Sequence, residues 1–349
     1  MKRLIIIFLP VLMLALSCAQ QGTVGKNDAA KRRFDAWVNV QKGKHPEYKW
    51  QQTELGSWIL EETIGTGAPS GDADEFPYIR CEITTEDLDG NIQTTTSAAL
   101  AKKLRKWEPS YYYGPVISYR AGNSLLAGVE ELVAGMNVGG SVRAAIPGWL
   151  LTAKRYKNAK GYLDNVTGTD AIYTIRLVET IPDVVQWELD SLARFIPTQG
   201  IAPADSAGKE GFYYICKKAP ASDRAFPSDT TVYINYTGRL LNGLVFDTSI
   251  ADTAEFYGIR SASRTYGPVK ITWASEYSSI TMGSSSTSLA EGFAFALWKM
   301  KAYEKGRTVF RSYLGYKESG IPNTAQTVFG VSIPGYSPLI FDIEFVDKN

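Results

Sequence analysis

The segment VYINYTGRLLNGLVFDTS, residues 232–249, holds the side chains whose types and spacing suggest chemistry. Hydrophobic alternation along its first half points Tyr236 in the same direction as the core. The Asn-Gly pair at 242–243 predicts a hairpin that returns Phe246 and Asp247 to the strand of Tyr236. The segment contains no histidine, no cysteine and no pair of acids. It therefore predicts an aromatic, nearly apolar surface with one carboxylate, and no nucleophile, base or metal ligand.

Two further rings are expected to join this surface. Phe293 falls in the first turn of an amphipathic helix, and Phe341 falls in an alternating strand near the end of the chain. Four aromatic side chains with few polar groups predict a concave pocket suited to an apolar ring such as that of proline.

Other classes of site find little support in the sequence. The one histidine, His45, lies in the polar segment QKGKHPEYK without ligand partners nearby, which argues against a catalytic triad or a zinc site. Cys81 and Cys216 lie in strand-like runs, and we expect two buried thiols in separate domains, with a disulfide as the alternative. We expect no cofactor. The 37 basic and 36 acidic residues give a net charge of +1, so nucleic-acid binding is not expected.

The elements that must position these residues occur twice along the chain. LLAGVEELVAGMNVGGSVRAAIP (125–147) and LAEGFAFALWKMKAYEKGRTVFR (289–311) each place a glycine, Gly128 or Gly292, at the start of an amphipathic helix. Each helix is followed by a strand with basic residues, and each unit closes on an alternating strand, AIYTIRLVE or LIFDIEFVD. An amphipathic helix precedes each unit, NDAAKRRFDAWVNVQKG in the first case and DVVQWELDSLARFIPTQG in the second.

This repeat predicts an α+β fold in which an antiparallel sheet wraps around a short central helix in each of two domains. A chain of 349 residues with 44% hydrophobic residues suits two cores. We divide the chain into a signal peptide (1–18), a linker with an N-terminal helix (19–55), a first domain (56–181), a linker helix (182–210) and a second domain (211–349).

The second unit resembles the FKBP family of peptidyl-prolyl isomerases over most of residues 211–349. Four motifs carry the resemblance and follow the order of the family: YTGRLLNGLVFD, LAEGFAFALWKM, RSYLGY and IPGYSPLIFDIEFVD. Each motif alone is weak, and the four in order are specific. The resemblance implies two FKBP-like domains, isomerase activity on prolyl bonds, and proline-containing unfolded or extended polypeptides as partners.

Prolyl isomerisation fits a site without reactive groups, because rotation about the peptide bond makes and breaks no covalent bond. The uncatalysed barrier is ~18–20 kcal/mol, and each ~1.36 kcal/mol removed speeds the rotation tenfold. A planar amide is more dipolar than a twisted one. A dry pocket therefore disfavours the planar state relative to the rotating one.

The resemblance also assigns roles to individual residues. Asp247 orders the site rather than accepting a proton, the hydroxyl of Tyr316 holds a substrate carbonyl, and the hairpin at Ile333 covers one side. The remaining positions are apolar: the walls and floor are Tyr236, Phe246, Phe293 and Phe341, and the rim is Leu289 and Ala290.

Three departures from the family pattern bear on this pocket. Phe293 stands where the family usually has Trp, which predicts a smaller floor and lower or altered activity. Residues 249–288 are longer than the usual connection, and we interpret them as an insertion that could cover the pocket. Lys317 follows Tyr316 where the family has Gly.

The first unit lacks the pocket signature. Alignment through Gly90 and Gly243 retains one ring of the set, Tyr173 opposite Phe341. We therefore predict an FKBP-like domain without isomerase activity. Its aromatic run LRKWEPSYYYGPV (104–116) either grips an unfolded chain or packs as a loop on its own rings. The positions that differ are Ile83 opposite Tyr236, Gln93 opposite Phe246, Thr94 opposite Asp247, Val129 opposite Phe293 and Thr152 opposite Tyr316.

The chain begins with a basic pair, an apolar run and small residues before a cysteine, MKRLIIIFLPVLMLALSC. This pattern is typical of a secretory signal, and ALSC resembles the bacterial lipobox, which implies a lipid anchor on Cys18. An ordinary cleaved signal with an incidental cysteine is the alternative. We expect a bacterial envelope lipoprotein, attached to the outer membrane and facing the periplasm.

Three functions remain open at this point. The first is an isomerase that assists the folding of exported proteins. The second is a module that binds extended chains without turnover, and the third is a structural envelope lipoprotein. Loss of the pocket residues in one unit and their retention in the other favours the first.

Overall fold

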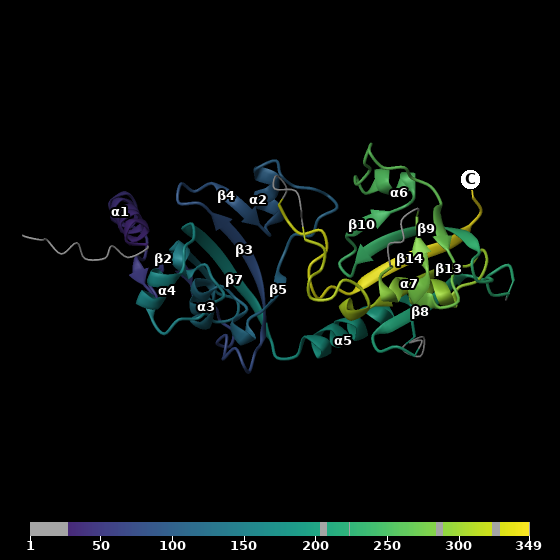
Figure 1. Cartoon of the computed structure of the whole chain (residues 1–349), viewed down its shortest axis with the longest axis horizontal. Helices are drawn as coiled ribbons and strands as arrows, with labels where there is room; N and C mark the ends of the chain where they lie inside the picture. The colour runs from purple at the N-terminus through teal and green to yellow at the C-terminus, as the bar shows by residue number, and fades with distance from the viewer. Residues whose placement is uncertain (1–26, 203–207, 223, 284–288, 323–328, 349) are drawn as a thin grey trace, which may run out of the picture.

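The computed structural model describes residues 27–202, 208–222, 224–283, 289–322 and 329–348. Within these residues, the strands form two seven-stranded antiparallel sheets, and each sheet comes from one of the two predicted units. Figure 1 shows the two domains side by side, with α5 (Val184–Phe195) below the junction between them. The predicted α+β class with two similar domains is confirmed.

The first domain runs from α1 to β7. Its helices are α1 (Asp28–Lys44), α2 (Ala98–Lys103), α3 (Ala127–Ala134) and α4 (Ala159–Asn165). Its strands are β1 (Gln51–Gln52), β2 (Trp58–Thr63), β3 (Tyr78–Glu86), β4 (Ile92–Thr95), β5 (Val116–Tyr119), β6 (Ser141–Ile146) and β7 (Ala171–Ile181).

The second domain repeats this order. Its helices after α5 are α6 (Ala251–Phe256) and α7 (Glu291–Lys299). Its strands are β8 (Phe212–Lys218), β9 (Thr231–Leu240), β10 (Val245–Thr248), β11 (Val269–Thr272), β12 (Thr281–Met282), β13 (Lys305–Phe310) and β14 (Leu339–Val346).

A glycine lets the central helix of each domain approach its sheet closely. A Cβ atom on Gly128 of α3 would lie 2.5 Å from Cγ2 of Ile146. The equivalent atom on Gly292 of α7 would lie 2.5 Å from Cγ of Phe310. Such distances are too short for any side chain, so these helices pack on β6 and β13 only with glycine at this position.

Helix α5 covers the face of the second sheet that lies opposite α7. Its Leu192 is fully buried and clusters with Val309 of β13 and Ile340 of β14. Asp183 caps the helix, because its Oδ1 accepts hydrogen bonds from the backbone N–H groups two and three residues later. The helix thus belongs to the packing of the second domain.

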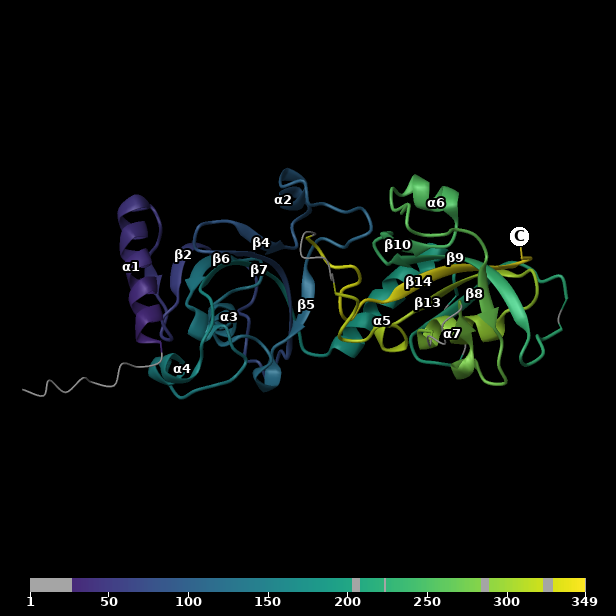
Figure 2. The ribbon, with the colours of Figure 1, turned by 45° about the horizontal axis from the view of Figure 1, so that its top comes forward.

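Helix α1 lies at the end of the first domain that is far from the second domain, as Figure 2 shows. Its Phe34 and Val38 are buried in the core of the first domain, and the ring of Phe34 lies 5.9 Å from that of Trp149. Among the described residues, no helix has the length and apolar character needed to cross a membrane. Cys18 lies outside the described residues.

The strand registers show how the two domains correspond. Gly238 of β9 pairs with Phe341 on one side and with Asp247 on the other. In the first domain, Thr85 of β3 pairs with Tyr173 and Thr94 in the same way. The register also shifts at the same place in both hairpins, next to Phe246 and Gln93. The alignment of Gln93 with Phe246 and of Thr94 with Asp247 is therefore confirmed.

The first half of the connection 249–288 has a counterpart in the first domain. Helices α2 and α6 occupy the same place in the two domains, so the long connection is common to both. Val116 and Val269, at equivalent ladder positions, are 153 positions apart, whereas Ala127 and Glu291 are 164 apart. The difference of 11 places the additional residues of the second domain between Thr272 and Glu291.

Two expectations about single segments also change. Cys81 is fully buried, and this burial raises the pKa of its thiol to about 12, but Cys216 is exposed on β8 rather than buried. In the aromatic run 104–116 the rings of Trp107 and Tyr113 stack at 6.5 Å, as expected of a loop that packs on its own rings, but the run also contacts the second domain. Its Tyr112 forms a β-bridge with Val331 of the second domain. In Figure 1 the yellow loop that precedes β14 extends to this blue segment.

Candidate active site

Four rings meet on the face of the second sheet that packs against α7. The centroid of Phe341 lies 4.8 Å from that of Phe293, 5.7 Å from Phe246 and 6.4 Å from Tyr236. Tyr236, Phe293 and Phe341 are about 95% buried, whereas Phe246 is only partly buried. The cluster thus consists of three buried rings and one ring that is partly accessible to solvent.

The local structure of each element explains this meeting. The hairpin between β9 and β10 closes at Asn242, whose Oδ1 accepts a hydrogen bond from the N–H of Leu244, and at Gly243, which has a φ of 87°. Gly238, within β9, leaves room for the rings, since a Cβ atom there would lie 2.7 Å from Phe246 and 2.8 Å from Phe341. The glycine of the Tyr-Thr-Gly motif is therefore required by packing.

A polar group of three side chains borders the rings. The hydroxyl of Tyr236 donates a 2.6 Å hydrogen bond to Oδ2 of Asp247. Arg264 forms an ion pair with Oδ1 of Asp247 and donates a 3.1 Å hydrogen bond to the hydroxyl of Tyr236. Burial, and next the charge of Asp247, raises the pKa of Tyr236 above its usual range, so its hydroxyl stays protonated.

Arg264 was not predicted from the sequence. It follows Asp247 after a connection with no regular period, so its spacing carries no signal. A usable signal was the repeated Tyr-Gly-Pro-Val at 113–116 and 266–269, which aligns this connection between the two domains. The need of a partly buried carboxylate for a cation was a second signal.

Tyr316 and Ile333 lie beside the same cluster. Tyr316 is partly buried; burial, and next the charge of Asp247, raises its pKa. Its hydroxyl forms no hydrogen bond within the described part of the chain, which leaves its proton free to donate. Ile333 is buried and pairs with Ile321 in a short bridge.

The predicted rim and the departure at Lys317 can also be placed. Leu289 and Ala290 are partly buried against the core cluster that contains the rings, and Ala290 occupies the N-cap position of α7 without a side-chain hydrogen bond. Lys317 has a φ of 55°, in the left-handed region that glycine adopts more easily. The structure brings all nine predicted pocket residues to one side of the second domain: Tyr236, Phe246, Asp247, Leu289, Ala290, Phe293, Tyr316, Ile333 and Phe341.

The corresponding place in the first domain has no such cluster. Ile83 and Gln93 replace two of the rings, and Thr94 bonds to Thr85 across the hairpin at 2.8 Å in place of an Asp–Tyr pair. Tyr173 remains, and burial raises its pKa. The fold of the first domain therefore persists without the ring-lined surface.

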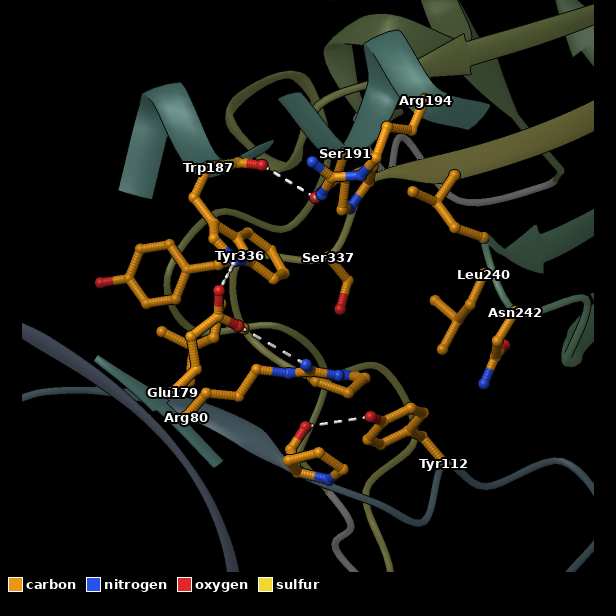
Figure 3. A pocket seen from close by; sticks show the side chains of 16 residues that line it. Arg80, Tyr112, Glu179, Trp187, Ser191, Arg194, Leu240, Asn242, Tyr336 and Ser337 are labelled. Carbon is orange, nitrogen blue, oxygen red and sulfur yellow. Dashed lines mark hydrogen bonds and ion pairs between the residues drawn. The ribbon is translucent and has the colours of Figure 1, made fainter. Parts of the chain in front are cut away.

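A separate cavity of about 360 Å³ lies at the junction of the domains (Figure 3). Trp187 of α5 donates a hydrogen bond to Glu179, which also pairs with Arg80 at 3.7 Å. Tyr112 and the segment 334–338 line the other sides. This cavity contains none of the four rings, so it is distinct from the candidate active site.

Comparisons with known proteins point to one family. The family model of the FKBP-type peptidyl-prolyl cis-trans isomerases matches residues 222–346. A search of curated proteins found no match.

Among solved structures, the three FKBP domains of wheat FKBP73 align with 14% identity over 83% of this chain and 93% of that one, with a TM-score of 0.29. A peptidyl-prolyl cis-trans isomerase from Pseudomonas syringae pv. tomato aligns with 20% identity over 47% and 94%, with a TM-score of 0.30. AtFKBP13 aligns with 20% identity over 41% and 98%, with a TM-score of 0.29.

Proposed function

Since the chain belongs, through its second domain, to the FKBP-type peptidyl-prolyl cis-trans isomerase family, we propose that this domain isomerises prolyl peptide bonds. The proposal rests on one observation. The rings of Tyr236, Phe246, Phe293 and Phe341 form a cluster beside Asp247, whose carboxylate is hydrogen-bonded to Tyr236. A prolyl ring that contacts this cluster leaves water on one face. The planar amide, which is the more dipolar state, loses more solvation there than the twisted one.

The polar residues then act as positioning and donor groups. Both carboxylate oxygens of Asp247 are engaged, one by Tyr236 and the other by Arg264, so the carboxylate is poorly placed to accept a proton from a substrate. Its role is to fix the ring of Tyr236. The hydroxyl of Tyr316, which has no hydrogen bond to the described residues, is the group that would donate to a substrate carbonyl while the C–N bond turns.

The substrates would be proline-containing segments of unfolded or extended polypeptides. The lipobox-like sequence at Cys18 supports a lipid anchor on the cell envelope of a bacterium. An isomerase held there would act on exported proteins, for which slow prolyl rotation limits folding. The partly exposed Phe246 is the ring that such a chain would meet first.

A measurement of cis-to-trans conversion of an X-Pro tetrapeptide tests this function. Phe246→Ala and Asp247→Leu should each lower kcat/KM at least about tenfold, equivalent to ~1.4 kcal/mol. The equivalent changes in the first domain, Gln93→Ala and Thr94→Leu, provide matched controls and should leave kcat/KM unchanged.

A parent chain that does not exceed the uncatalysed rate would refute the enzyme proposal. A loss of activity in the first-domain controls would refute the assignment of the site to the second domain. Suppression of client aggregation that persists in Phe246→Ala, with no turnover in the parent, would instead favour a chain-binding module.

A further inference from the structure

One loop of the second domain belongs to the candidate pocket and to the domain junction at once. Its Ile333 is buried in the core cluster that contains the four rings. Two residues earlier, Val331 pairs with Tyr112 of the first domain through backbone hydrogen bonds of 2.7 and 3.0 Å. The segment 329–338, called the pocket loop below, therefore connects the first domain to the ring cluster.

Further contacts fix the pocket loop to the first domain. The N–H of Gly330 donates to the carbonyl of Thr95 at 3.2 Å. Phe329 is buried, and the ammonium of Lys106 lies 4.6 Å from the centre of its ring. These contacts give the backbone of the loop partners that its own domain does not supply.

Two tyrosines of the first domain complete the attachment. Tyr112 packs against the core cluster of the second domain, and its hydroxyl is tied back to the carbonyl of Pro115 at 2.9 Å. The ring of Tyr78 lies 5.4 Å from that of Tyr336, which follows Ile333 in the pocket loop. The pocket loop is thus held on both sides of Ile333.

The loop that carries Tyr112 has a counterpart with a different task. In the second domain this connection supplies Arg264 to the candidate site. Both connections are built alike, since the hydroxyls of Tyr113 and Tyr266 accept a backbone N–H five residues earlier, at 3.0 and 2.9 Å. At the tip, Tyr112 takes the place of Thr265 and pairs with Val331 of the other domain.

The α5 side of the pocket loop offers less support. The cavity of about 360 Å³ separates residues 334–338 from Trp187 and Ser191 of that helix (Figure 3). A loop that borders a cavity loses packing contacts on that side. The backbones of Gly330 and Val331 are held by the first domain, whereas Ile333 pairs with Ile321 and the N–H of Tyr336 donates to the carbonyl of Lys317 within the second domain.

We propose that the first domain positions the pocket loop of the second, and that Tyr112 is the positioning residue. A held loop keeps Ile333 in place before a substrate arrives, so the ordering cost is met by folding rather than by binding. The inference rests on the proposed isomerase function. It gives the first domain a task in the full chain that needs no pocket of its own.

Kinetics and amide hydrogen exchange of the full chain test this inference. Tyr112→Ala should raise KM for an X-Pro tetrapeptide about threefold to tenfold, with kcat within about twofold of the parent. Exchange at the amides of Gly330 and Val331 should accelerate, whereas exchange in β13 and β14 should not. Tyr112→Phe loses only the bond to Pro115 and should restore both readouts.

A second variant and a control make the test independent of one side chain. Gly330 has a φ of 87°, and a Cβ atom there would lie 2.8 Å from the carbonyl oxygen of Tyr112. Gly330→Val should therefore separate the loops and reproduce the rise in KM. Tyr303→Ala, at a tyrosine that bonds Asp347 near the end of the chain, should leave KM and exchange unchanged.

Each remaining outcome decides against the inference. An active parent with an unchanged KM in Tyr112→Ala and Gly330→Val refutes the positioning role and leaves the isomerase proposal intact. A loss of kcat with faster exchange throughout β13 and β14 shows general unfolding and also refutes it. A parent without catalysis refutes the isomerase proposal itself, and the inference with it.

Discussion

At the scale of single residues, the candidate site depends on how one carboxylate is held. Asp247 has one oxygen on Tyr236 and the other on Arg264, and its side chain is 31% exposed. A carboxylate in this setting stays fixed only while both partners remain. The orientation of the Tyr236 ring, and with it one side of the ring cluster, follows from this pair of contacts.

We expect Arg264→Leu to lower kcat/KM for an X-Pro peptide about fivefold, the effect of one hydrogen bond worth ~1 kcal/mol. Arg260→Leu serves as the control, because Arg260 forms an exposed ion pair with Glu255 in the same connection. Equal activity of the two variants would show that Arg264 does not order the site.

The sequence predicted those site residues that lie in compact motifs. Tyr236, Phe246 and Asp247 sit in one hairpin, so strand alternation and an Asn-Gly turn were enough to bring them together. Arg264 reaches the same carboxylate from a connection whose path is set by tertiary packing, and no local spacing predicts that. The signals available were the repeated Tyr-Gly-Pro-Val, which aligns this connection between the domains, and the need of a partly buried carboxylate for a cation.

At the scale of elements, helix α5 joins the second domain through a buried acid. Glu188 is 4% exposed and accepts a 2.7 Å hydrogen bond from the N–H of Ser312 and another from its hydroxyl. Burial raises the pKa of this carboxyl, although the bonds from Ser312 and the charge of Arg311 lower it in part. The raised pKa means that the folded state favours the protonated form.

This shift predicts a pH-dependent effect of Glu188→Gln. Below the unfolded pKa the acid is neutral in both states, and the substitution should change the Tm little. As the pH rises through the folded pKa, the parent loses stability because its buried carboxylate becomes charged. At pH 8 we therefore expect the variant to melt about 2–4 °C above the parent.

Thermal unfolding at pH 4 and pH 8 measures this difference. Glu255→Gln, at an exposed acid on α6, should give the same Tm as the parent at both values. A lower Tm for Glu188→Gln at pH 8 would show instead that the bonds to Ser312 outweigh the cost of burial.

Elements with a regular period were predictable, and shorter ones were not. Helices α3 and α7 were expected from a glycine followed by apolar residues at helical spacing, and both occur. Helices α2 and α6 have only six residues each, too few to produce a periodic signal. For this reason, the sequence did not show that this part of the connection is common to both domains.

At the scale of the whole molecule, the two domains have the same plan and different surfaces. At equivalent positions of the strand register, the second domain has Asp247, paired with Gly238, and the first domain has Thr94, paired with Thr85. The docking of Tyr112 on Val331 was not predictable, because an aromatic run indicates that a partner exists without indicating which surface it is. The contact between the domains thus came from the structure alone.

The expected anchor gives a prediction for the full chain in a bacterial cell. Cys18→Ser should move the protein from the membrane fraction to the soluble envelope fraction, because the lipid attachment would be lost. Fractionation after labelling with a fatty-acid probe measures this change. A parent chain that takes up no label and fractionates like Cys18→Ser would support an ordinary cleaved signal instead.

The attachment of α5 determines where the chain can be cut. A fragment that starts at residue 211 would lack Leu192 and Ile196, which cover Val309 and Ile340. The exposed apolar surface would favour aggregation. Cutting ahead of Asp183 would spare that cover and the cap of the helix. An isolated second domain should therefore begin before Asp183 and include the connecting helix α5.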